Sequence, residues 1–260
     1  MQRALVALSL LVLPAAPLFG QSLADRIAGI RDGYVRFQFN ARPGICGDGE
    51  HFIRMGRHTY MGNMSAGPRD LSCVPGPVQI RMRMDEGTVE RLEYWVGPVR
   101  EREGQQLGVV SSAEAARFLL GIAARGSSSP SAKAIFPAVI ADSAMVWPTL
   151  LTIAHDEATR SRNARQEAMM WLSRFAAGAL AGRPNDPTVD DDHDDDGSKE
   201  DLKSHAVFVL SQLRNHEGVP ALLDVARSSR DVHVRGQALY WLGQSGDPRA
   251  LALFESILRG

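Results

Sequence analysis

Two octapeptides, RQEAMMWL at residues 165–172 and RGQALYWL at residues 235–242, carry arginine, alanine, tryptophan and leucine at the same four positions. This spacing brings the four residues to one side of an α-helix. A third copy, KSHAVFVL at residues 203–210, has lysine, alanine, valine and leucine at those positions. A helical face that recurs along a chain is typical of stacked helical repeats, because each unit meets its neighbour in the same way.

A second recurring segment separates these copies. VPALLDVA at 219–226 is similar to WPTLLTIA at 147–154, and each has proline where the first turn of a helix tolerates it. The sequence therefore predicts pairs of helices. The copies lie 32 residues apart between Ala206 and Ala238, and 38 apart between Ala168 and Ala206, where an acidic run adds length. We expect Ala168, Ala206 and Ala238 to occupy equivalent inward positions in successive layers.

The segment DVHVRGQALYWLGQSGDPRALALFESIL at 231–258 resembles a HEAT-like repeat of the short kind found in phycobilisome-lyase-type repeats. The resemblance extends over about residues 134–260. It implies an α-solenoid that binds other proteins, in which Asp231, Arg235 and the equivalent Arg165 tie loops and adjacent repeats together. It does not imply a lyase activity.

The N-terminal part has a different period. In YVRFQFN at 34–40 and QIRMRM at 79–84, apolar and polar residues alternate, as in strands with one buried face. Asp85-Glu86-Gly87 predicts a hairpin turn into TVERLEYWV at 88–96. We therefore expect an α+β protein, mainly α: a small antiparallel β-rich domain at 21–105 and helical repeats at 106–260.

The first 20 residues have the pattern of a signal peptide. Arg3 precedes the apolar run ALVALSLLVL at 4–13, which is too short to span a bilayer, and small residues follow Pro14. A retained membrane anchor is the alternative. Removal of this segment predicts a periplasmic or secreted protein, with no other span. In such a compartment, Cys46 and Cys73 are expected to form a disulfide.

The acid of the chain is concentrated in one place. Residues 190–201 carry eight acids and one lysine, a charge of −7, so the rest of a chain with a net charge of −1 carries +6. The near-zero total makes no general case for nucleic acid or membrane binding. The insert at 186–201 is interpreted as a solvated connection. The alternative is a weak Ca²⁺ site, because Asp192, Asp194, Asp196 and Glu200 partly match a calcium loop, although Lys203 stands where its closing glutamate belongs.

These observations favour a protein-binding scaffold that is not an enzyme and needs no cofactor. The partner is not identified by the sequence. The alternative is an enzyme with a site in the β-rich domain, formed by Cys46, Asp48, His51 and His58. A cysteine nucleophile needs a lowered pKa and a nearby base, and no histidine is placed beside Cys46 by the sequence itself.

Overall fold

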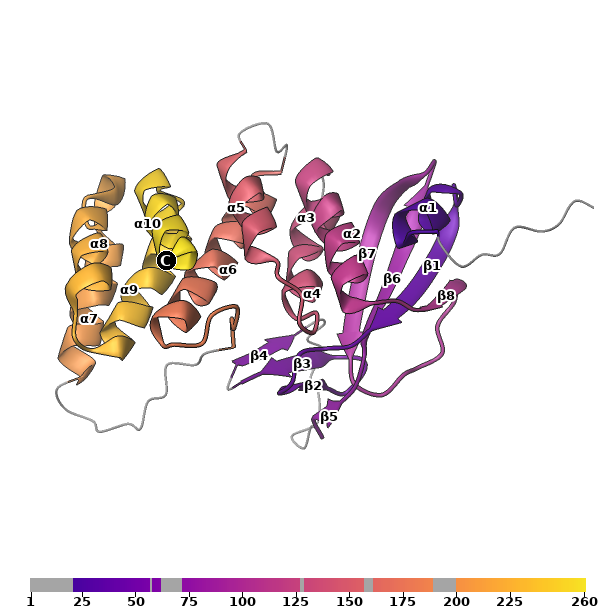
Figure 1. Ribbon diagram of the computed structural model, residues 1–260, viewed down its shortest axis with the longest axis horizontal. Helices are drawn as coiled ribbons and strands as arrows, with labels where there is room; N and C mark the ends of the chain where they lie inside the picture. The colour runs from indigo at the N-terminus through magenta and orange to yellow at the C-terminus, as the bar shows by residue number, and fades with distance from the viewer. Residues whose placement is uncertain (1–20, 57, 62–71, 127–128, 157–160, 189–199) are drawn as a thin grey trace, which may run out of the picture.

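The computed structural model describes residues 21–260 apart from residue 57 and the segments 62–71, 127–128, 157–160 and 189–199. Within these ranges, a β-rich region is followed by an array of helices (Figure 1). The expected signal peptide at 1–20 and the acidic residues Asp192, Asp194 and Asp196 lie outside the described residues.

The first sheet has the strand order β7-β6-β1-β8. Its strands are β1 (Gly33–Phe39), β6 (Val78–Asp85), β7 (Thr88–Val96) and β8 (Gln105–Val109). The alternation of apolar and polar residues predicted for β1 is confirmed, since Val35, Phe37 and Phe39 are buried on one face. The β6–β7 hairpin turns at Glu86 and Gly87, both with positive φ (48° and 80°), as a two-residue turn matched to strand twist requires.

This sheet is mixed, which corrects the expectation of an antiparallel domain. Strand β8 pairs with β1 in parallel. Strand β7 pairs antiparallel with β6, and β6 pairs antiparallel with β1, so β7 and β8 run in the same direction at opposite edges of the sheet. Residues 97–104 must therefore cross the outer face of the sheet before β8 begins. The Arg102 guanidinium lies 3.7 Å from the Trp95 ring centroid on this path. Strand β8 also continues past residue 105, the expected end of the β-rich domain.

A second, antiparallel sheet has the order β4-β3-β2-β5. It is built from β2 (Ile45–Gly47), β3 (Phe52–Met55), β4 (His58–Met61) and β5 (Val74–Pro75). Its backbone touches the end of β7, because a Cβ on Gly97 would lie 2.4 Å from the carbonyl oxygen of Gly47. Only glycine permits this approach between the two sheets.

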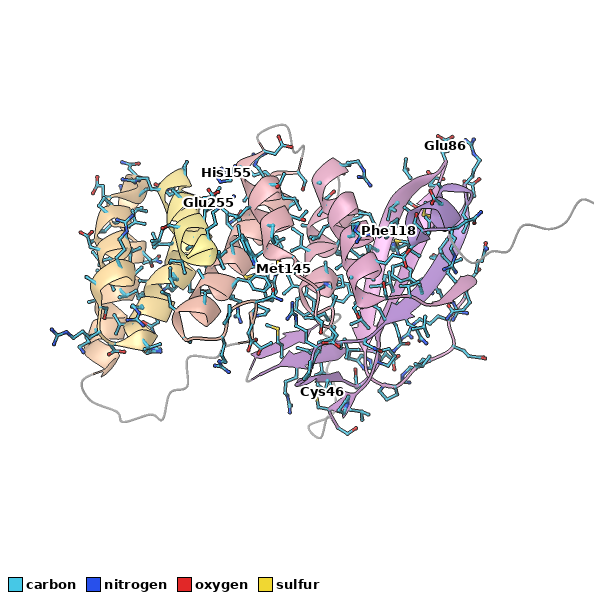
Figure 2. All side chains as sticks on the ribbon, viewed as in Figure 1. Cys46, Glu86, Phe118, Met145, His155 and Glu255 are labelled. Carbon is cyan, nitrogen blue, oxygen red and sulfur yellow. A yellow bond between two sulfur atoms is a disulfide. The ribbon has the colours of Figure 1, made fainter. Side chains whose placement is uncertain are left out.

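One helix precedes the strands of the first sheet in the chain and three follow them. They lie on the inner face of the sheet, where Val35, Phe37 and Phe39 are buried. They are α1 (Leu23–Ala28), α2 (Ser112–Arg125), α3 (Ser129–Lys133) and α4 (Ile135–Val139). Phe118 of α2 meets Phe37 of β1 edge to face, with ring centroids 6.1 Å apart (Figure 2). One continuous cluster of buried side chains runs from Leu23 to Phe254, so the sheet and the helices share a core.

Arg42 ties the β-rich region to the helices. Its guanidinium donates to the carbonyl oxygens of Val139 at 2.8 Å, Asn185 at 3.0 Å and Ala144 at 2.7 Å. Burial lowers the pKa of Arg42, and the nearby carboxylates of Asp186 and Asp142 oppose that effect. Three segments far apart in the sequence are thus held by one half-buried cation.

The remaining helices form two rows (Figure 1). One row holds α5 (Trp147–His155), α10 (Pro248–Arg259) and α8 (Val219–Ser228), and the other holds α6 (Arg162–Leu180), α9 (Val232–Ser245) and α7 (Glu200–Ser211). Helix α6 packs against α5 and α9, and α9 packs against α7 and α8. The short 3₁₀ turn η1 (Arg214–His216) joins α7 to α8.

The order of the pairs in space differs from their order in the chain. The last pair, α9 and α10, lies between α5–α6 and α7–α8 (Figure 1). The contact between His155 of α5 and Glu255 of α10, at 3.3 Å, marks this junction (Figure 2). The repeats by themselves predict layers in chain order. Helix α7 follows α6 in the chain but stands at the far end of the array, beyond α9 (Figure 1).

Helices α6 and α9 meet through faces that do not carry the repeated motif. A Cβ on Gly243 would lie 2.8 Å from Ser173 Oγ and 2.9 Å from Ser173 Cβ. The motif face of α6 points the other way, where Trp171 contacts Phe136 of α4 at 5.4 Å. The motif face of α9 points toward α7. Two blocks of helices therefore meet back to back at the Gly243–Ser173 contact.

Candidate protein-interaction site

The motif face of α9 is covered by α7. Val234 and Ala238 are buried there, and the Trp241 ring lies 5.4 Å from the Phe208 ring of α7. Ser204 Oγ lies 3.3 Å from His233 Nε2 along the same contact. Among the described side chains of α7, Val207 is the one that is buried. The motif faces of α6 and α9 therefore each pack against a helix that precedes them in the chain, α4 and α7 respectively.

The motif face of α7 is different, because α7 begins its block and stands at the end of the array. Ala206 is exposed, and Val209 and Leu213 are 46% and 44% exposed, whereas Ala168 and Ala238 are 0% exposed. The expectation that Ala206 occupies an inward position was wrong. Its place in the repeat register is as predicted, but the described chain provides no preceding layer to cover it. We call Ala206, Val209 and Leu213 the α7 strip.

A pocket of about 280 Å³ opens at the C-terminal end of this strip. Apolar side chains from three helices form its walls, and polar groups stand at its rim. The lining includes Leu210, Leu213, Val219, Leu222, Trp241 and His216. Its size is close to the lower range of pockets that hold ligands, so it has room for one large side chain. Leu213 belongs to both the pocket and the α7 strip, which makes them one continuous surface.

His216, at the edge of the pocket, belongs to a charged cluster around Asp247. Asp247 caps α10 by accepting from the Arg249 backbone N–H at 2.9 Å, and its carboxylate also pairs with the Arg249 guanidinium at 2.8 Å and with His216 Nδ1 at 3.3 Å. The hydrogen bonds from Arg249 lower the pKa of Asp247 to about 2, against the opposing effect of burial. This carboxylate therefore stays ionised and fixes η1 beside α10.

The repeated charged residues hold turns and helix ends together. Asp231 caps α9 by accepting from the Val234 backbone N–H at 3.3 Å, and it also pairs with Lys203 of α7 at 3.5 Å. Arg235 donates to the Ser229 carbonyl oxygen in the α8–α9 turn at 3.0 Å. Arg165 is half-buried on α6. At the start of α6, Ser161 accepts from the Ala164 N–H, as Asp231 does in α9.

The β-rich region places Cys46 and Cys73 in a disulfide, with an S–S distance of 1.97 Å. Cys46 is therefore not a thiol nucleophile in this structure, which removes the central residue of the alternative enzyme site. Asp48 and His51 do lie together, with Oδ2 and Nδ1 2.9 Å apart. Burial tends to raise the pKa of Asp48, but hydrogen bonds from His51, Glu50 and Phe52 lower it to about 2. The side chain of His58 lies outside the described side chains.

The described part of the chain contains no group of three or more histidine, cysteine, aspartate or glutamate residues placed to hold a metal ion. The Ca²⁺ alternative stays untested, since Asp192, Asp194, Asp196 and the Glu200 side chain are not described. Among the described helices, none is both long and apolar enough to cross a membrane.

The array of helix pairs defines a class of protein built from helical repeats. Residues 195–260, which contain α7, α8, α9 and α10, match the family model for HEAT repeats. The resemblance read from Asp231, Arg235 and Ala238 is thereby confirmed for this part of the chain. HEAT repeats generally mediate protein–protein interaction and are a non-catalytic type of module. Comparisons with curated proteins and with solved structures gave no match.

Proposed function

We propose that this protein is an exported scaffold, in which a solenoid of HEAT-like helix pairs binds another protein in the periplasm or outside the cell. The observation that supports binding most strongly is the HEAT match over 195–260, together with a motif-bearing helix face left exposed in the same segment. An exposed face of the type that is buried elsewhere in the array is suited to a protein partner.

Export is supported by two features that are independent of the helices. The N-terminal residues have the signal-peptide pattern, and the Cys46–Cys73 bond needs an oxidising compartment to persist. N-terminal sequencing of the protein from its native host tests this proposal. A mature chain that begins near residue 21 and has no free thiol supports it. A chain that keeps Arg3 and titrates two thiols overturns it.

Site-specific photo-crosslinking in the native host tests the scaffold role. A photoreactive residue replaces Arg227, exposed on α8, or Gln212, exposed just after α7; a third variant carries it at Glu86, exposed at the β6–β7 turn, as the control. Discrete protein adducts at Arg227 or Gln212, and none at Glu86, support binding through the helices. Adducts only at Glu86, or none at any position, would overturn it.

A further inference from the structure

We infer that the α7 strip and its pocket receive one amphipathic helix of the partner protein, which adds a further layer to the end of the array. This inference rests on the proposed scaffold function and names the surface and the kind of partner. The array offers two internal precedents for the contact. The motif face of α6 is covered by α4 through Phe136, and the motif face of α9 is covered by α7 through Phe208.

The repeat register shows what the α7 strip is suited to contact. Ala206 and Val209 stand where Ala238 and Trp241 stand in α9. In α9 the small alanine permits a close helix approach, and the neighbouring apolar residues fill the volume beside it. The α7 strip thus keeps the composition of a helix-packing face while it remains exposed. A solvated outer helix would be expected to carry polar residues there, as capping repeats do.

Helix α8, which pairs with α7 at the end of the array, does carry polar residues on its exposed face. On α8, Asp224, Arg227 and Ser228 are exposed, and the apolar Leu222 and Leu223 are buried. The exposed apolar residues of this layer are therefore confined to α7 and the turn that follows it. A surface one helix long and one helix wide fits a single helix better than a second protein domain.

Size also argues against a second copy of this chain as the occupant. Three partly exposed apolar residues and one pocket bury only a few hundred Å² per partner, compared with roughly 800 Å² per partner in a stable interface of standard size. A symmetric contact of α7 with its own copy would offer no further area. A partner protein that binds through one helix gains the remaining binding energy from contacts that it makes outside this helix.

The pocket defines the helix further. A large apolar side chain one or two turns along the partner helix enters the pocket beside Trp241 and Leu213. Charge does not select the flanks of this helix, because the acids Glu200, Asp201 and Glu217 offset Lys203 and Arg214 along the same stretch, and Lys203 already pairs with Asp231.

The test uses the full mature protein and a synthetic helical probe. The probe is a labelled 16-residue peptide, by design, with leucine at i, i+4 and i+7 and one tryptophan a turn further on; in a matched peptide glutamate replaces the leucines and the tryptophan. Fluorescence anisotropy measures binding to the wild type, Val209→Glu, Leu213→Glu and Met145→Glu. Met145 is 67% exposed and lies before α5, away from the strip, and is the control position (Figure 2).

We expect the apolar probe to bind the wild type and Met145→Glu equally, and Val209→Glu and Leu213→Glu at least about tenfold more weakly. We expect the glutamate-substituted peptide to bind the wild type more weakly than the apolar probe does. The inference is overturned if Met145→Glu weakens binding as much as the strip variants do, or if the probe does not bind. It is also overturned if the wild type self-associates without peptide and Val209→Glu becomes monomeric, since the occupant is then a second copy.

These outcomes are separable from failure of the scaffold proposal. Photo-crosslinked adducts that persist on the helices in Val209→Glu, with no probe binding to the wild type, would overturn the helix inference alone. Absence of adducts from every helical position would overturn both. Circular dichroism of each variant shows whether an exposed substitution has altered the fold.

Discussion

The back-to-back contact of α6 and α9 can be tested through Gly243. A Cβ at this position would lie 2.8–2.9 Å from the Ser173 side chain and 3.2 Å from the Met169 carbonyl oxygen. Overpacking of this kind costs about 2 kcal/mol. Replacement of a helical glycine by alanine also gains about 1 kcal/mol in helix propensity. We therefore expect Gly243→Ala to lower the free energy of unfolding by about 1 kcal/mol.

A second substitution isolates the contact. Ser173→Gly alone costs about 0.5 kcal/mol in helix propensity, but it removes the side-chain atoms that the methyl group introduced by Gly243→Ala would meet. In the double variant the overpacking is relieved, so its stability should return to near that of the wild type. The coupling energy between the two positions is then about 2 kcal/mol. Gly121→Ala in α2 is the control, because its Cβ would meet only the flexible end of the Arg125 side chain, and we expect it to be stabilising.

Urea unfolding of these variants and the wild type, with the disulfide intact, measures these values. Additive effects of Gly243→Ala and Ser173→Gly, within about 0.5 kcal/mol, would show that the two residues are not in contact. The back-to-back junction of α6 and α9 at this contact would then be refuted.

Three further predictions concern the elements that hold the fold together. Cys46→Ala/Cys73→Ala should lower the free energy of unfolding by about 3–4 kcal/mol, because the bond closes a loop with a separation of 27 residues, and thermal melts with and without reductant measure it. Arg42→Met should cost about 3 kcal/mol through three lost hydrogen bonds to buried carbonyl groups, and Arg42→Lys should not restore it, as denaturant curves can show. Because the pKa of Asp247 is lowered in the folded state, its contribution is present above about pH 4 and is lost as the pH falls toward 2; in Asp247→Asn, melting temperatures should lose this part of their pH dependence.

Much of the fold followed from local patterns. Alternation at Val35, Phe37 and Phe39 predicted β1, and the recurring alanine at positions 168, 206 and 238 predicted three helices in a common register. These signals are strong because the spacing of apolar residues along the sequence shows which face of a helix or strand is buried. Strand β8 lacked such a signal: Gln105 and Gln106 are exposed, and the parallel pairing depends on a crossover that no short segment encodes.

The order of the helix pairs could not be read from the repeats. Repeated faces specify which kinds of surface meet, but they do not specify which copy meets which. The exposed face of α7 was missed for this reason, and with it the pocket beside His216. The spacing of 38 residues before Ala206, against 32 after it, gave no such signal, because the acidic run accounts for the difference.

The position of α10 has a consequence for truncation. This helix comes late in the described chain, yet it contacts α5, α6, α8 and α9, and its Phe254 is fully buried. Loss of an outer unit from a conventional stack of repeats leaves a shorter stack. Here, loss of residues 248–259 would leave α6 packed on α9 but open a gap inside the array and expose the apolar sides of α5 and α8, so the core of the array closes only once α10 is in place.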